Sequence, residues 1–152
     1  MNKVRQFPME RVLAEIDWFG FHKVPYVDGA DANFLILERD EQIAEALIKA
    51  KERWGFPEKF RVSWAKYSND KIAERIFRVA GKLHRSGQLK SVTLALQSLN
   101  DQTMVDIKRK NIAMSSFAKL QERYMDEGIP TYTELILGLP GETYGSFVDG
   151  ID

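Results

Sequence analysis

The 152-residue sequence contains no cysteine. This absence excludes a disulfide framework, a thiolate nucleophile, a cysteine zinc site and an iron–sulfur cluster held by this chain alone. Histidine is also scarce, with only His22 and His84, so a histidine-rich metal site is disfavoured. We therefore expect no metal ligands from this chain.

An excess of one charge is missing as well, because 22 Lys and Arg residues balance 22 Asp and Glu residues. A chain-wide basic field for nucleic acid is absent, which argues against an RNA-modifying role. No stretch approaches the ~20 apolar residues of a membrane helix. The first residues also lack the apolar core of a signal peptide. We expect a cytoplasmic protein with neither a membrane nor a nucleic-acid partner.

Apolar residues recur at helical spacing in several segments, with charged residues between them. Asn69 is a candidate N-cap, and Gly87 and Gly128 are candidate helix ends. The expected long helices span residues 8–20, 38–54, 69–86 and 113–127, with shorter helices at 101–108 and from 144 onward.

Four short apolar runs between these helices are predicted to be strands. They are Lys23–Val27, Phe60–Ala65, Ser91–Gln97 and Thr131–Leu137. The last two are nearly continuous, as expected of strands covered on both faces. Strand–helix alternation predicts an α/β fold of parallel β/α repeats, with about four strands and outer helices. Such repeats form either an open doubly wound sheet or part of a TIM-like barrel, since a complete barrel needs ~250 residues.

Polar residues follow the first two predicted strands, at the strand ends where parallel β/α folds bind ligands. Asp31 and Asn33 lie in a glycine-containing segment that either meets a ligand or forms a turn bonded to its own backbone. Ser63 lies near the end of the second strand and Lys66 directly follows it. Lys66 either meets a ligand carboxylate or is simply solvated.

The third and fourth predicted strands end in similar polar segments. Gln97 and Ser98 close the third strand, where a buried glutamine needs a hydrogen-bond partner from the core or from a ligand. The basic cluster 108–111 is either a solvated surface or a site that holds a carboxylate or a phosphate. After the fourth strand, Gly138–Thr143 suits a tight turn that lets a planar ring approach the backbone. A plain strand-to-helix turn would also use these residues.

Taken together, these motifs closely resemble radical S-adenosylmethionine proteins, especially those that carry a cobalamin-binding domain upstream. The resemblance runs from about Gln6 to Asp152 and rests on the order and spacing of four motifs. These are Asp31-Ala32-Asn33-Phe34, Gln97-Ser98-Leu99-Asn100, Ile107-Lys108-Arg109-Lys110-Asn111, and Glu134-Leu135-Ile136-Leu137-Gly138-Leu139-Pro140-Gly141-Glu142-Thr143 with Ser146-Phe147 after it.

The resemblance implies a partial barrel domain over residues 1–152, covering about the second to fifth strands. Proteins of this family hold a [4Fe–4S] cluster through a C-x3-C-x2-C loop after the first strand, and this sequence lacks that loop. The cluster cleaves S-adenosylmethionine to a 5′-deoxyadenosyl radical, which serves hydrogen abstraction or methyl transfer. We therefore expect a fragment of an enzyme that is inactive by itself. The cluster, and cobalamin if the parent uses it, belong to the full-length parent only.

The resemblance also assigns roles in binding S-adenosylmethionine. Asp31 and Asn33 correspond to the loop that meets the methionine amino group. Gly138 and Leu139 correspond to the backbone along adenine. The inward polar positions that meet the ribose and carboxylate or the second substrate are Ser63, Lys66, Gln97 and Ser98. Arg109, with Lys108 as the alternative, corresponds to the basic residue available to the carboxylate.

Two hypotheses of different classes therefore remain. In the first, the chain is part of a radical S-adenosylmethionine enzyme that acts on a small-molecule substrate, and the isolated chain self-associates through unpaired sheet edges. In the second, it is a non-catalytic α/β module that binds a nucleotide or a protein through its strand-end loops. Monomeric, cooperatively folded and nucleotide-binding behaviour would favour the second hypothesis.

Overall fold

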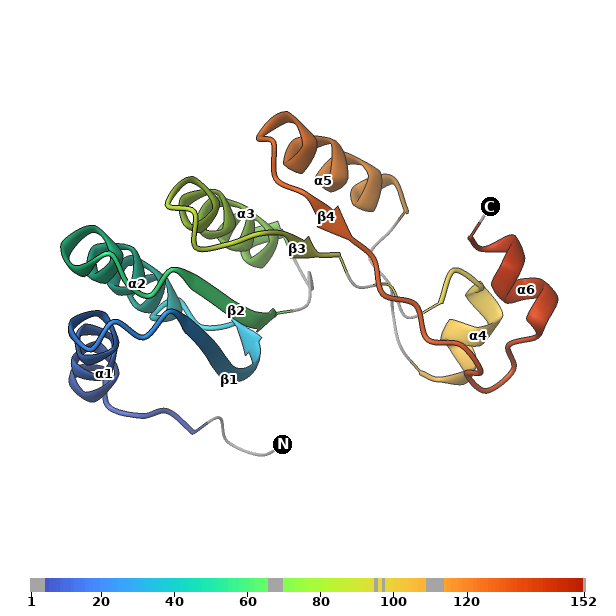
Figure 1. Cartoon of the computed structure of the whole chain (residues 1–152). Coiled ribbons are helices and arrows are strands. Elements are labelled where there is room, and N and C mark those ends of the chain that lie inside the picture. The colour runs from blue at the N-terminus through green and yellow to red at the C-terminus, as the bar shows by residue number, and fades with distance from the viewer. Residues whose placement is uncertain (1–4, 66–69, 95, 97, 109–113, 152) are drawn as a thin grey trace. The chain divides into compact units, whose positions relative to one another are not determined.

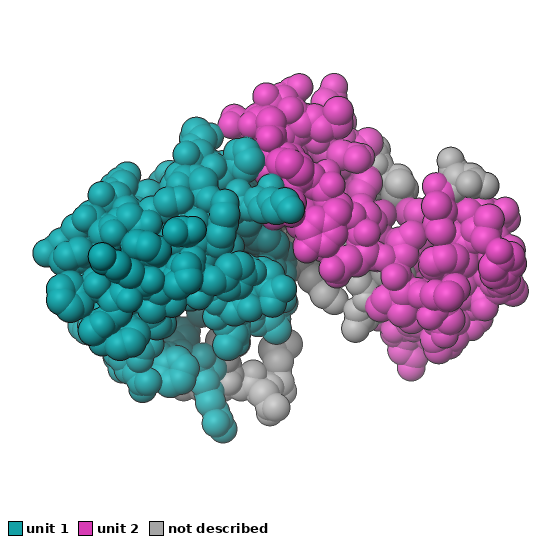
Figure 2. Space-filling model, in the orientation of Figure 1, with its two compact units in different colours: residues 1–90 teal, residues 91–152 magenta. Residues whose placement is uncertain are grey.

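A computed structural model of the chain describes residues 5–65, 70–94, 96, 98–108 and 114–151. The chain forms two compact units, Met1–Lys90 and Ser91–Asp152, which Figure 2 colours separately. Each unit contains parallel strands and helices in alternation, so the predicted parallel α/β architecture is confirmed at this level. Closure of the strands into a barrel stays a prediction. No helix in the described part of the chain is both long and apolar enough to cross a membrane.

The first unit contains three helices and a parallel strand pair. Its strands are β1 (Tyr26–Phe34) and β2 (Lys59–Trp64), which run parallel. Figure 1 shows α2 between α1 and α3, and both of these neighbours contact it. The helices are α1 (Met9–Phe21), α2 (Asp40–Trp54) and α3 (Asp70–Arg85).

The second unit contains a shorter parallel pair with three helices. β3 (Val92–Thr93) pairs with β4 (Thr131–Tyr132), and the Leu94 N–H extends the ladder by donating to the Tyr132 carbonyl at 2.9 Å. The helices are α4 (Asp101–Asp106), α5 (Met114–Asp126) and α6 (Tyr144–Asp149).

The strand boundaries differ from those predicted. β1 does not end at Val27 but continues to Phe34, because β2 supplies hydrogen-bond partners beyond that point. β3 and β4 are shorter than predicted, since only two residue pairs form a ladder in the described part of that sheet. Ile136 and Leu137 were predicted to continue the fourth strand, yet they lie outside it and are 45% and 67% exposed. An apolar run forms a strand only where a neighbouring strand supplies the hydrogen bonds.

Helix ends follow the predicted signals where they can be described. Gly87 and Gly128 have φ of 73° and 68° just after α3 and α5, a conformation that glycine adopts without steric cost. Asn100 caps α4, because its side chain accepts a hydrogen bond from the Thr103 N–H at 2.9 Å. The proposed cap Asn69 lies outside the described residues.

The two faces of the β1–β2 pair differ in polarity, because successive side chains of a strand point to opposite faces. Phe60 is buried, and Val62 and Trp64 on the same face are half-buried. Arg61 and Ser63 lie on the other face and are exposed. The pair therefore packs one apolar face into the core of the unit and presents one polar face.

Candidate functional site

The middle of β1, between Gly29 and Phe34, leaves the hydrogen-bonded ladder that β1 forms with β2. Gly29 pairs with Val62 and Phe34 pairs with Trp64, so β1 advances five residues while β2 advances two. The surplus residues cannot pair and form a bulge. Asp31 and Asn33 lie in this bulge and are exposed. The prediction that they are accessible to a ligand is therefore compatible with the structure.

Asp31 bonds the backbone of its own turn, as one of the two interpretations of the sequence anticipated. Its Oδ1 accepts a hydrogen bond from the Asn33 N–H at 2.8 Å. The Asn33 carbonyl accepts from the Ile36 N–H at 3.1 Å. A carboxylate held in this way has a second oxygen with room for a ligand donor, so the turn and the ligand interpretations do not exclude each other.

Two buried charged side chains that the sequence analysis missed hold the next residues. Leu35 is fully buried and has φ of 71°. Its N–H donates to Asp40 Oδ2 at 3.0 Å, and its carbonyl accepts from Arg75 Nη1 at 2.9 Å. Arg75 lies on the apolar stripe of α3 beside Ile76, and a charge on such a stripe is the signal that could have revealed it.

Burial raises the pKa of Asp40, because desolvation penalises the charged carboxylate. Hydrogen bonds from the Leu37 and Leu35 N–H groups oppose this effect and favour the charged form. The nearby carboxylate of Asp31 raises the pKa of Asp40 further. Asp40 is therefore electrostatically linked to the candidate ligand turn.

The polar face of β1 and β2 carries a second pair of charges. Arg61 donates from Nε and Nη2 to the two carboxylate oxygens of Asp28, each at 2.8 Å. The hydrogen bond from Arg61 lowers the pKa of Asp28. Ser63 lies two residues beyond Arg61 on the same exposed face, toward the carboxyl end of β2. Lys66, predicted to join Ser63, lies outside the described residues.

In the second unit, the end of the third predicted strand meets the Gly138–Thr143 loop. Ser98 is buried, and its Oγ donates to Glu142 Oε1 at 2.6 Å while accepting from the Asn100 N–H at 3.1 Å. Glu142 Oε2 is buried without a hydrogen-bond partner in the described structure. Gln97 and Arg109 lie outside the described residues. The structure thus brings together two of the predicted motifs within this unit.

The Gly138–Thr143 loop forms the tight turn that its sequence predicts. The Glu142 N–H donates to the Leu139 carbonyl at 3.0 Å, with Pro140 and Gly141 between them. Gly141 has φ of 80°, as the third position of a type II turn requires. Gly138 is exposed with φ of 83°, and Leu139 is half-buried. This leaves backbone and one apolar side chain accessible together.

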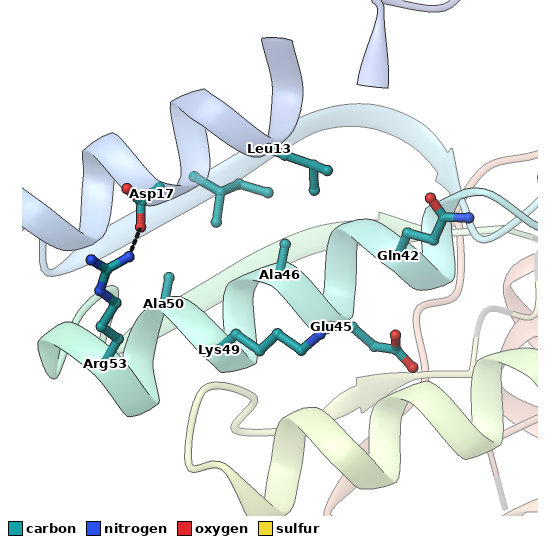
Figure 3. Close-up of a pocket in the computed structure, with 9 residues that line it drawn as sticks. Leu13, Asp17, Gln42, Glu45, Ala46, Lys49, Ala50 and Arg53 are labelled. Carbon is teal, nitrogen blue, oxygen red and sulfur yellow. Dashed lines mark ion pairs between the residues drawn. The ribbon is translucent and has the colours of Figure 1, made fainter. Parts of the chain in front are cut away.

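A separate groove of about 410 Å³ lies between α1 and α2. Figure 3 shows Leu13 and Asp17 of α1 facing Ala46 and Arg53 of α2, with an Asp17–Arg53 ion pair of 3.6 Å. Among the described residues of the first unit, no predicted site residue lines this groove. In the described part of the chain, no three His, Asp or Glu side chains gather as metal ligands.

Comparison with known proteins gives two similar relatives. No family model matches the chain. The chain is 46% identical over 151 residues to the cobalamin-dependent radical SAM methyltransferase TokK of Streptomyces tokunonensis. It is equally similar to the 2-(S-pantetheinyl)-carbapenam-3-carboxylate methyltransferase of Streptantibioticus cattleyicolor.

Each match covers 99% of this chain but only 22% of the relative, so the chain spans about a fifth of the length of the curated relatives it matches. The 151 aligned residues span all four motifs on which the family resemblance rests. The resemblance is thereby confirmed: nearly the whole chain aligns with a segment of a protein that is named as a cobalamin-dependent radical SAM methyltransferase.

Proposed function

We propose that this chain forms the second to fifth strands of a radical S-adenosylmethionine barrel and supplies strand-end loops that hold S-adenosylmethionine in a methyltransferase. The observation that carries the proposal is the 46% identity over 99% of the chain. Parallel β/α units in both halves support it, because barrels of this kind are built from such units.

The residues fit S-adenosylmethionine in chemical type. An aminoacyl sulfonium needs an acceptor for its ammonium group, and Asp31 offers an exposed carboxylate. The adenine ring of S-adenosylmethionine needs a flat slot with accessible backbone. Gly138 offers exposed backbone, and Leu139 beside it offers a half-buried apolar side chain. Ser98 and Glu142 place polar groups at the end of the third strand.

The iron–sulfur cluster does not fit this chain. Its family ligands are three thiolates, and the sequence has no cysteine. The role assigned here is therefore binding and orientation of S-adenosylmethionine, and cluster chemistry is left to other parts of a full-length enzyme. In the same proposal, the polar face with Asp28, Arg61 and Ser63 lines the barrel interior, since alternate strand residues of a barrel point inward.

Titration calorimetry of the chain with S-adenosylmethionine, S-adenosylhomocysteine and ATP tests the proposal. We expect saturable binding of the first two and none of ATP. Asp31→Asn should weaken S-adenosylmethionine binding about tenfold, because a charge-assisted hydrogen bond is lost. Asp126→Asn is the matched control, since Asp126 is an exposed carboxylate at the end of α5, before β4 begins.

The outcomes separate the hypotheses. Binding of ATP with no binding of S-adenosylmethionine would favour a nucleotide-binding module. S-adenosylmethionine binding that is equally strong in Asp31→Asn and Asp126→Asn would remove Asp31 from the site. Absence of saturable S-adenosylmethionine binding would overturn the claim that the loops of this chain hold the ligand.

A further inference from the structure

The turn that joins β1 to α2 is held in an uncommon conformation. We define the clamped turn as residues Asn33–Leu37. Leu35 within it has φ of 71°, a region that branched and bulky residues rarely adopt. The Asn33 carbonyl accepts from the Ile36 N–H, and the Leu37 carbonyl accepts from the Asp40 N–H at 3.2 Å. Such a backbone persists only where surrounding groups determine it.

Asp40 and Arg75 bind the clamped turn from two sides. Asp40 Oδ2 accepts the N–H groups of Leu35 at 3.0 Å and Leu37 at 3.3 Å. Arg75 Nη1 donates to the carbonyls of Leu35 at 2.9 Å and Ile36 at 3.2 Å. Both charged residues are buried, with relative exposures of 4% and 5%. The buried polar groups of the turn are thus satisfied by side chains of α2 and α3.

Arg75 also contacts two glutamates, but each of these has another cation. Glu38 pairs with Arg75 and with Lys71, and Glu41 pairs with Arg75 and with Arg78. The two carbonyls of the clamped turn have only Arg75 as a side-chain donor in the described structure. Loss of the guanidinium would therefore leave the carbonyls without a donor while the glutamates kept their partners.

The clamped turn is continuous with the residues that carry the ligand chemistry. Asp31 bonds the Asn33 N–H, and Asn33 bonds Ile36 inside the turn. The chain of hydrogen bonds therefore runs from the Asp31 carboxylate to the guanidinium of Arg75 through two short backbone links. A change in the backbone at Leu35 would move Asn33 and, through it, the Asp31 carboxylate.

We propose that Arg75 and Asp40 are positioning residues: they fix the clamped turn so that Asp31 faces the ammonium group of an aminoacyl sulfonium ligand. The claim about the ligand rests on the proposed function, whereas the claim about the backbone does not. Neither residue touches the ligand. Their effect on affinity passes through the conformation of residues 31–37.

Arg75→Met tests the proposal, with Arg78→Met as the matched control. Both variants remove a guanidinium from α3 that pairs with Glu41, but Arg78 is exposed and, within the described structure, makes no hydrogen bond to the clamped turn. NMR-detected amide exchange in the 152-residue chain should be about tenfold faster at Leu35 and Leu37 in Arg75→Met. Exchange at Leu47 in α2 should be unchanged. Arg78→Met should resemble the wild type at all three amides.

Ligand affinity supplies the readout that a purely structural role would not move. S-adenosylmethionine affinity, measured well below the melting temperature of the variant, should fall at least about fivefold in Arg75→Met. Arg75→Lys should recover part of it, because an ammonium can still donate to one carbonyl. Asp40→Asn, which keeps the shape of the side chain and one acceptor oxygen, supplies a second variant if Arg75→Met does not fold.

Three results would count against the proposal, at different levels. Unchanged exchange at Leu35 in both Arg75→Met and Asp40→Asn would overturn the clamp itself. Faster exchange at Leu35 with unchanged S-adenosylmethionine affinity would overturn the positioning role. A wild-type chain that binds no S-adenosylmethionine would overturn the proposed function and the ligand claim, and faster local exchange would then support the backbone claim alone.

Discussion

At the scale of single residues, the described carboxylates with shifted pKa fall into two groups. Hydrogen bonds from Arg61, Lys71 and Lys82 lower the pKa of Asp28, Glu38 and Glu45, respectively. Burial raises the pKa of Asp40 instead. A lowered pKa makes the folded state more stable above the unfolded-state pKa, and that stability is lost as the pH falls. Asp40 has the opposite effect on stability as the pH rises, because ionising its carboxyl group costs more free energy in the folded state than in the unfolded state.

Glu38→Gln should make the chain less sensitive to acid. Glu38 contributes stability above about pH 4.3, and this contribution disappears as the pH falls through its lowered folded-state pKa. The variant should therefore be less stable than the wild type at pH 7, and the difference should shrink toward pH 3. Urea unfolding at both pH values measures this, and Lys71→Met should behave similarly. A difference that grows on acidification would contradict the assignment.

Gly141→Ala and Gly138→Ala separate backbone strain from crowding. Both positions have φ near 80°, so each alanine should cost about 1 kcal/mol through its backbone conformation. A Cβ at Gly138 meets no atom within 4 Å, whereas a Cβ at Gly141 meets the carboxylate of Asp106. Asp106 Oδ1 also accepts from Gln102 Nε2 at 2.9 Å.

Gly141→Ala should therefore cost about 1 kcal/mol more than Gly138→Ala, because Asp106 must move and lose that hydrogen bond. Chemical denaturation of the two variants measures the difference. Equal losses of stability in the two variants would show that the Asp106 side chain moves aside without a cost in free energy.

At the scale of elements, the bounds of the helices and of β2 were predictable from the sequence, whereas the bounds of β1, β3 and β4 were not. The six helices in the described part of the chain lie where apolar periodicity and the glycine ends indicated, since a helix makes its backbone hydrogen bonds within one segment. A strand depends on a partner elsewhere in the chain, so neither the bulge at Asp31 nor the short β3 could be inferred. Likewise, the Ser98–Glu142 bond joins residues 44 positions apart, which a single sequence does not pair.

Glycines in two helices should respond oppositely to the same substitution. Gly20→Ala in α1 should destabilise the chain by about 1–3 kcal/mol, because the new Cβ meets the Trp54 ring of α2 and lies 3.2 Å from the Phe56 carbonyl. For Gly81→Ala in α3, the three atoms nearest to the new Cβ belong to the Arg85 guanidinium, the closest at 3.2 Å, and the variant should be more stable by up to about 1 kcal/mol through helix propensity. Urea midpoints compare the two. Destabilisation by Gly81→Ala would show that Arg85 cannot yield.

At the scale of the whole molecule, the chain should not hold an iron–sulfur cluster. Anaerobic reconstitution with iron and sulfide should leave no protein-bound visible absorbance and no stoichiometric iron after desalting, because the sequence has no cysteine to ligate it. Bound iron at about four atoms per chain would contradict this prediction. A cysteine-containing radical S-adenosylmethionine enzyme, treated in parallel, is the positive control.

The isolated chain should also self-associate. In the described structure β1 pairs only with β2 and β3 only with β4, and the exposed Ile136 and Leu137 follow β4. Unpaired strand edges with apolar residues favour association between chains. Light scattering after size exclusion should show a mass that rises with concentration, and Leu137→Lys should reduce it. A strictly monomeric wild type would favour an independent binding module.

The bulge in β1 has a consequence for divergence among related chains. From one flanking pair to the next, β1 advances five residues and β2 only two, so the backbone between Gly29 and Phe34 contains residues that the ladder does not need. An insertion or deletion there can change the length of the bulge while both flanking pairs keep their register. If the proposed function holds, ligand preference can therefore change at this point while the strands on either side keep their pairing.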